Sequence, residues 1–99
     1  ATGLTPEYLA DFAAPFVLEA HIKLGMAVAE VQELAINGTV LVIGEIRFVT
    51  LPAGVMADDG YVDIEAAGTV ALSGLDSYHR TQREGRWQYA KPDKAPATF

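Results

Sequence analysis

The sequence feature that most constrains the fold is an Asn37-Gly38 pair between two apolar runs. Asn-Gly favours a two-residue type I′ turn, because both residues of that turn have a positive φ. The run that follows, residues 39–51, is dense in β-branched residues and predicts a strand. The preceding run, residues 16–36, is ambiguous by composition, and the turn favours a strand there too. The sequence therefore predicts a long antiparallel β-hairpin.

The first strand of this hairpin contains a break in its pattern. Apolar side chains occupy every second position from Ile22 to Val28, and the alternation is lost at residues 29–31. Such a break predicts a β-bulge, which moves the following side chains to the other face. A two-residue turn would also pair Leu34 with Leu41.

The rest of the chain predicts shorter elements. Thr5-Pro6-Glu7 is typical of a helix start, and Pro15 would end that helix, so we expect two helical turns over Pro6 to Ala13. A turn at Asp58-Asp59-Gly60 leads into a short predicted strand, Tyr61 to Ile64. The following stretch, residues 65–72, favours a weak helix or irregular structure.

Composition excludes several classes of protein. The chain has 99 residues, of which 51% are apolar, so it is one small domain able to bury a core. Its net charge of −6 argues against a nucleic-acid binder. With no cysteine it has no disulfide, thiolate metal site or thiol nucleophile. No signal peptide, transmembrane run or basic amphipathic stretch is visible, so we expect no membrane partner and a cytoplasmic location.

The standard catalytic motifs are absent, and isolated ionisable residues offer weak alternatives. His21 and His79 have no metal-ligand spacing, so two surface or half-buried histidines are favoured over a metal site. Glu30 and Glu45 would face each other across the hairpin, and their repulsion would raise the pKa of one carboxyl. The favoured alternative is that the bulge separates them.

The segment from Ser73 to Arg80 is the richest in functional groups. It combines a glycine, hydroxyls, an aromatic ring, an imidazole and a guanidinium. In one interpretation it is a ligand-binding loop, where Tyr78 stacks on a planar ring and Arg80 and the hydroxyls bind a phosphate. In the other it is a helix N-terminus capped by Asp76 or Ser77, with Arg80 in solvent. Chemistry alone favours the second interpretation.

Several segments, taken in order, resemble one known family. They are GLTPE at 3–7, PFVLEAHIKLG at 15–25, LVIGEI at 41–46, DDGYVD at 58–63, SGLDSYHR at 73–80 and YAKP at 89–92. This order is similar to the C-terminal half of the flavin reductase-like domain family, the FMN-binding split β-barrels. The resemblance covers nearly all of the chain.

The resemblance implies a mainly β split-barrel fold, with the long hairpin and the short N-terminal helix as parts of it. It also implies non-covalent FMN binding, usually in a homodimer. Members typically pass electrons from NADH or NADPH through the flavin to an acceptor, whereas some only carry the flavin. Nothing here matches the family's N-terminal half, so we expect a C-terminal portion over residues 1–91 and an exposed tail over residues 92–99.

The resemblance also points to residues. It carries no catalytic side chain over to this chain, and it places no metal here. The expected cofactor-binding residues are Ser73, Gly74, Tyr78, His79 and Arg80. The alternative function is a small β interaction module, or a flavin-carrier or dimerisation fragment without its own cofactor, paired with a second copy or with the missing half.

Overall fold

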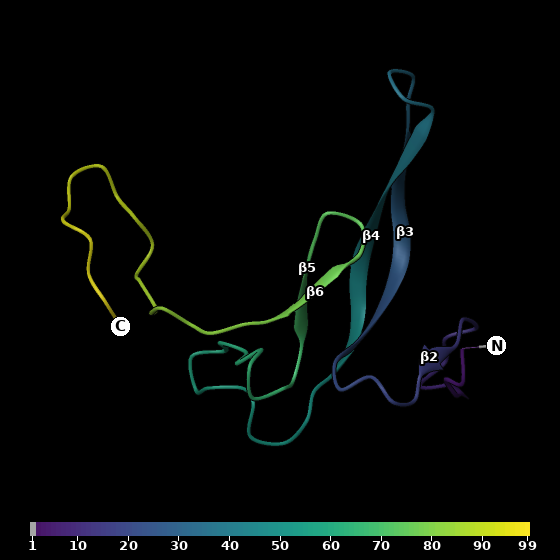
Figure 1. Ribbon diagram of the computed structural model, residues 1–99, viewed down its shortest axis with the longest axis horizontal. Coiled ribbons are helices and arrows are strands. Elements are labelled where there is room, and N and C mark those ends of the chain that lie inside the picture. The colour runs from purple at the N-terminus through teal and green to yellow at the C-terminus, as the bar shows by residue number, and fades with distance from the viewer. Residues whose placement is uncertain (1) are drawn as a thin grey trace.

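The computed structural model describes residues 2–99, and every regular element in that range is a β-strand. The strands are β1 (Pro6–Glu7), β2 (Phe16–Val17), β3 (Lys23–Leu34), β4 (Thr39–Thr50), β5 (Val70–Ser73) and β6 (Ser77–Arg80). They form three separate two-stranded antiparallel sheets, β1–β2, β3–β4 and β5–β6 (Figure 1). The mainly β prediction is confirmed.

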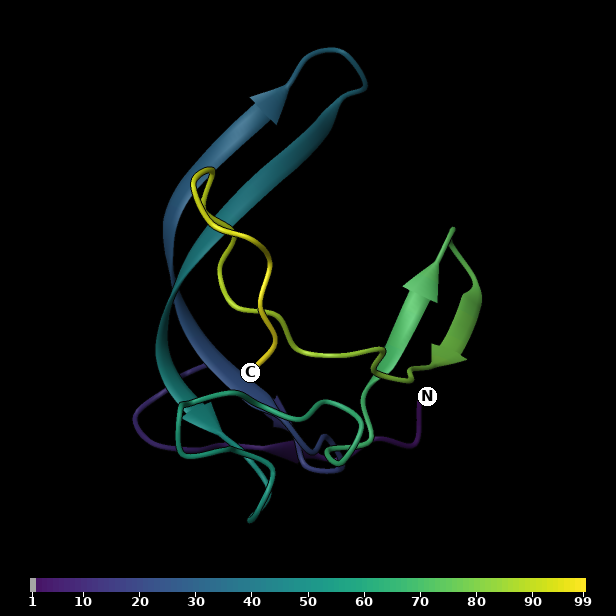
Figure 2. The same ribbon diagram turned by 90° about the vertical axis from the view of Figure 1, so that its left-hand side faces the viewer.

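The β3–β4 hairpin dominates the molecule and curves along its length (Figure 2). The predicted bulge is confirmed, because the register shifts between Val28 and Glu30. The predicted two-residue turn is wrong, since Leu34 pairs with Thr39 and residues 35–38 form the loop. The amide of Gly38, whose φ is +68°, donates to the carbonyl of Leu34 at 3.0 Å. A four-residue loop needs positive φ only at this glycine, so Asn37 keeps a negative one.

The two faces of the β3–β4 hairpin differ in polarity. Because directly paired residues project to the same side of a sheet, the register assigns each side chain to a face. We call one side the apolar face; its apolar members include Met26, Val28, Val31, Val40, Val42 and Ile46, and one charged residue, Glu33, lies on it opposite Val40. The other side alternates apolar and polar residues, with Glu30 opposite Ile43 and Gln32 opposite Leu41. Every residue of the apolar face is exposed in this chain.

The predicted helix over Pro6 to Ala13 is wrong. Pro6 and Glu7 instead pair with Val17 and Phe16, and Ala10 has a φ of +48° that no right-handed helix contains. Two turns of isolated helix are marginal, so contacts elsewhere decide this segment.

An aromatic cluster provides those contacts. The rings of Phe12, Phe16 and Phe48 lie with each pair of centroids 5.8 Å apart. The Phe12 ring lies directly over Gly25, where an added Cβ would approach it to 2.7 Å. This packing ties the N-terminal segment to the base of the long hairpin.

A turn-rich segment connects β4 to β5 and contains the buried apolar side chains Val55 and Ala67. The predicted strand Tyr61 to Ile64 is reduced to a single bridge between Met56 and Val62. Asp63 ends it, because its side chain accepts hydrogen bonds from the amides of residues 65 and 66 and opens a tight turn.

The C-terminal segment, residues 82–99, extends away from the hairpins (Figure 1). It folds back on itself through a bridge between Trp87 and Thr98. Arg86 anchors it, with its guanidinium 3.9 Å from the centroid of Tyr61 and 4.3 Å from that of Phe99.

The chain buries little of its own surface. Its accessible surface is 8436 Å², whereas a compact monomer of this mass exposes about 5,500 Å². The radius of gyration is 17.5 Å, against about 13 Å for a compact domain of this length. The excess of about 3,000 Å² is larger than the area of about 1,000–2,500 Å² that one partner contributes to most large permanent interfaces.

Candidate functional site

The candidate site is the β5–β6 hairpin together with the turn that precedes it. Neither the loop nor the helix N-terminus expected for residues 73–80 is present. Val70 pairs with Arg80, Leu72 with Tyr78 and Ser73 with Ser77. Gly74, with a φ of +59°, begins the connecting turn. The Ser and Tyr of this segment therefore lie on strands, where a two-residue alternation decides their direction.

That alternation divides the expected site residues between two faces. Tyr78 and Arg80 lie on one face with Leu72 and Val70. Ser73 and His79 lie on the opposite face with Ala71 and Ser77. The structure therefore does not bring all five expected residues to one surface.

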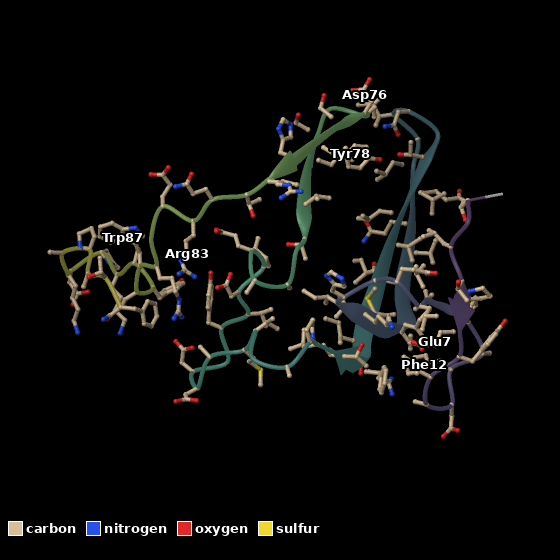
Figure 3. All side chains as sticks on the ribbon, turned by 60° about the horizontal axis from the view of Figure 1, so that its bottom comes forward. Glu7, Phe12, Asp76, Tyr78, Arg83 and Trp87 are labelled. Carbon is tan, nitrogen blue, oxygen red and sulfur yellow. The ribbon has the colours of Figure 1, made fainter. Side chains whose placement is uncertain are left out.

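The face of Tyr78 can accept a planar ring. The Tyr78 side chain is 73% exposed and projects from β6 on the side of the β3–β4 hairpin (Figure 3). Gly74, at the end of the same hairpin, has open space where a Cβ would be. An exposed aromatic ring beside an unobstructed turn offers a surface for stacking.

The opposite face contains a serine–histidine contact. Ser73 Oγ and His79 Nε2 are hydrogen-bonded at 2.8 Å. Both side chains are exposed, and in the described part of the chain no carboxylate is hydrogen-bonded to the other ring nitrogen. The pair lacks the third group that orients the base in a nucleophilic triad. Sequence reasoning missed this contact because it joins residues across two strands whose pairing was not predicted.

A cavity lies at the other end of the β5–β6 hairpin, away from the turn at Gly74. Its volume is about 390 Å³, and its lining residues are Glu65, Gly68, Thr69, Val70, Arg80 and Thr81. Among residues 2–99 Arg80 forms no ion pair. Of the expected site residues only Arg80 lines this cavity. Sequence analysis did not identify the two threonines or Glu65 as candidates. The pairing of Val70 with Arg80 brings them together, and a prediction of that pairing would have found them.

The other sequence candidates do not form sites. His21 is hydrogen-bonded through Nδ1 to the carbonyl of Ala67 at 2.6 Å, and it supports the turn before β5. Across residues 2–99 no group of three metal-ligating side chains gathers. Glu30 pairs with Ile43, so the bulge does separate it from Glu45, as favoured. Glu45 instead forms an ion pair with Arg47 at 2.9 Å.

Asp59 anchors the C-terminal segment. Arg86 donates to its carboxylate at 2.7 Å, and the amide of Tyr61 donates to the other oxygen at 3.1 Å. The hydrogen bond from Arg86, followed by that from Tyr61, lowers the pKa of Asp59 below its usual value. The Asp58-Asp59-Gly60 turn is confirmed as a structural turn that also provides an attachment point.

Within the described range no helix is long and apolar enough to cross a membrane. A scan against protein-family models and a search of curated proteins returned no match. One solved structure is similar: a "putative flavin reductase with split barrel domain" from Shewanella frigidimarina NCIMB 400. The two chains are 50% identical with a TM-score of 0.85, over 89% of this chain and 44% of that one. This chain therefore spans less than half of that protein and, over the shared part, is similar in sequence and fold to a flavin reductase-like split-barrel protein.

Proposed function

We propose that the chain is part of a flavin-dependent oxidoreductase that passes electrons from NADH or NADPH through FMN to an acceptor. The observation that carries this proposal is the 50% identity, at a TM-score of 0.85, to a flavin reductase-like split-barrel protein. FMN, when bound, would supply the two-electron carrier, and the polypeptide would bind and orient it. The cytoplasmic location stays a prediction.

The residues of the β5–β6 hairpin fit such a group in part. Tyr78 and Arg80 lie two positions apart on one face, about 7 Å along the strand. Tyr78 offers a stacking surface for a planar ring, and Arg80, which forms no ion pair among residues 2–99, offers a guanidinium for an anion. Ser73 and His79 lie on the other face, so they would reach the same ligand only around the turn at Gly74. We therefore assign Tyr78 and Arg80 as the principal contacts.

Equilibrium titration with FMN tests the proposal. We expect the full chain, or its assembly, to bind FMN with a change in the flavin absorption bands. We also expect NADH or NADPH to bleach those bands anaerobically. The Tyr78→Ala variant is expected to bind about fivefold more weakly, since stacking on an aromatic ring contributes on the order of 1 kcal/mol. A sample that stays colourless with excess FMN would contradict the proposal for this chain.

The exposed surface favours a second candidate function, that of an assembly module. The excess of about 3,000 Å² and the exposed apolar face of β3–β4 indicate that further polypeptide packs on this chain. We propose that the partner is a second copy or the complementary part of a split barrel. Sedimentation equilibrium distinguishes the two. A dimer supports the second copy, whereas a monomer with a molten core points to the complementary part. A well-packed monomer would contradict both.

A further inference from the structure

We infer that the C-terminal segment of one chain packs on the apolar face of β3–β4 in a second copy, and that this contact is reciprocal. The inference rests on the assembly function proposed above and deepens it, because it commits to the second copy and names the two surfaces that meet. Since each chain supplies one segment and one face, such a contact closes into a dimer. It involves no cofactor, so it can be tested without flavin.

The C-terminal segment is folded before it meets a partner. The amide of Gln88 donates to the carbonyl of Ala97 at 2.9 Å, and the amide of Phe99 donates to the carbonyl of Arg86 at 3.3 Å. The side-chain amide of Gln88 donates to the carbonyl of Thr98 at 3.2 Å. A segment that is already ordered loses less conformational entropy when it binds.

The C-terminal segment is held away from the β3–β4 hairpin of its own chain. Arg86 donates to Asp59 and Arg83 donates to Tyr61, and both acceptors belong to the turn-rich segment between β4 and β5. Figure 1 shows the C-terminal segment on the far side of β5–β6 from β3–β4. Among residues 2–99 no hydrogen bond or ion pair joins it to β3 or β4. The apolar face that it covers is therefore expected on another chain.

The C-terminal segment carries aromatic side chains that its own chain leaves uncovered. Trp87 is 62% exposed, Tyr89 is 90% exposed and Phe99 is 68% exposed. Because a buried aromatic side chain covers about 150–250 Å², the three leave about 450 Å² open. If each segment covers an equal area of the apolar face, the two reciprocal contacts bury about 1,800 Å², the size of a standard specific interface.

The apolar face offers a surface that suits these rings. Each of its apolar side chains is more than half exposed, from Met26 to Ile46. Four of them are valines, and aromatic rings pack favourably against β-branched side chains on a sheet. The thioether of Met26 adds a favourable contact with an aromatic ring.

The two surfaces also carry opposite charges. The C-terminal segment contains four of the seven basic residues and two of the thirteen acidic ones, so its net charge is +2 and that of residues 1–81 is −8. Among residues 2–99 neither Lys91 nor Lys94 forms an ion pair, and neither does Glu33 on the apolar face. Opposite charges steer two surfaces together and fix their register, which favours a second copy as the partner.

Sedimentation equilibrium of the parent chain and of variants at exposed residues tests the contact. Tyr89→Ser removes the most exposed ring of the segment, and Tyr8→Ser, at a tyrosine that is 66% exposed, is its matched control. Glu33→Lys reverses the charge on the apolar face, and Glu30→Lys reverses the same charge on the opposite side of the hairpin. The thermal midpoint of each variant verifies that it is folded.

We expect the parent chain to be a dimer. Tyr89→Ser should weaken it about tenfold or more, because each dimer loses two buried rings, whereas Tyr8→Ser should stay within about twofold of the parent. Glu33→Lys should weaken it severalfold more than Glu30→Lys. Adding Lys91→Glu and Lys94→Glu to the Glu33→Lys chain should restore part of the loss, because the charges are then exchanged instead of opposed.

A mixture of two labelled chains shows which surfaces meet. The chain has no cysteine, so Ala95→Cys provides a single attachment site for a nitroxide on the C-terminal segment. This chain is mixed with an isotope-labelled parent chain, whose amide signals alone are detected. The nitroxide should broaden the signals of Val31 and Val42 on the apolar face, which only a contact between two copies can do.

A monomeric parent overturns the inference. So does a dimer in which Tyr89→Ser and Tyr8→Ser have equal effects, or in which the broadening lies away from β3–β4. Such a dimer would leave the proposed assembly function standing through other surfaces. Conversely, a chain that dimerises through the C-terminal segment but stays colourless with excess FMN supports the inference and removes the proposed flavin function.

Discussion

The two main hairpins share one antiparallel design but differ in what their side chains offer. The β3–β4 hairpin has 12-residue strands and a face that is apolar apart from Glu33. The β5–β6 hairpin has 4-residue strands that carry serines, an imidazole, a phenol and a guanidinium. The long hairpin therefore resembles one wall of a larger barrel, whereas the short one presents side chains of the kinds that commonly contact ligands. The difference teaches that composition separates the two surfaces: the one we propose to pack on further polypeptide is mostly apolar, and the one we propose to contact a ligand is polar.

The largest expected effect concerns the apolar face of the long hairpin. Val42→Lys places a charge in its centre, and Leu41→Lys places the same charge on the mixed face one residue away. If polypeptide covers the apolar face, Val42→Lys should cost about 3 kcal/mol or more in the free energy of unfolding of the assembly, because a buried unpaired charge is expensive. Urea denaturation measures this loss of unfolding free energy. Equal effects of the two variants would remove the distinction between the faces.

An intermediate effect is expected at the base of the same hairpin. An added Cβ at Gly25 would come within 2.7 Å of the Phe12 ring, so Gly25→Ala must displace the aromatic cluster. Overpacking of this kind costs about 1–3 kcal/mol. Gly85→Ala serves as the control, because its nearest contact would be an ordinary 3.4 Å. Thermal unfolding compares the two, and a Gly25→Ala variant as stable as the parent would contradict the packing described.

The smallest effect concerns the segment that continues from the short hairpin. The pKa of Asp59 is lowered in the folded chain, chiefly by its hydrogen bond from Arg86. The ionised Asp59 therefore stabilises the folded chain at pH values above its ordinary pKa of 3.8. This stabilisation is lost as the pH falls through the lower pKa of the folded state. The fluorescence of Trp87, the single tryptophan, should change in that acidic range. The Asp59→Asn variant should lack this change in fluorescence. If the change persists in the variant, a group other than Asp59 causes it.

The sequence predicted the long hairpin because a turn signal and a period-two pattern agreed over many residues. The bulge was also predictable, since it breaks that period at residues 29–31. The loop length was not, because Asn37-Gly38 fits several turn types and the register depends on pairing along the whole ladder. The prediction of an N-terminal helix was wrong for a related reason. Phe12 packs against Gly25 and Phe48, and no local sequence pattern predicts this long-range contact.

The sequence draws attention to residues of the candidate site, but their geometry could not be predicted from it. Tyr78 and Arg80 stand out in the sequence, yet their shared face depends on the pairing of β6 with β5. The cavity was not predictable, because Glu65 and Thr81 belong to segments that only the strand pairing of Val70 with Arg80 brings together.

Amide hydrogen exchange with and without FMN tests the contrast between the two hairpins most directly. The account predicts that FMN slows exchange over residues 70–81 and leaves the distal pairs of β3–β4, such as Val31 with Val42, unchanged. Slower exchange confined to β3–β4, or no change anywhere at saturating FMN, would contradict it.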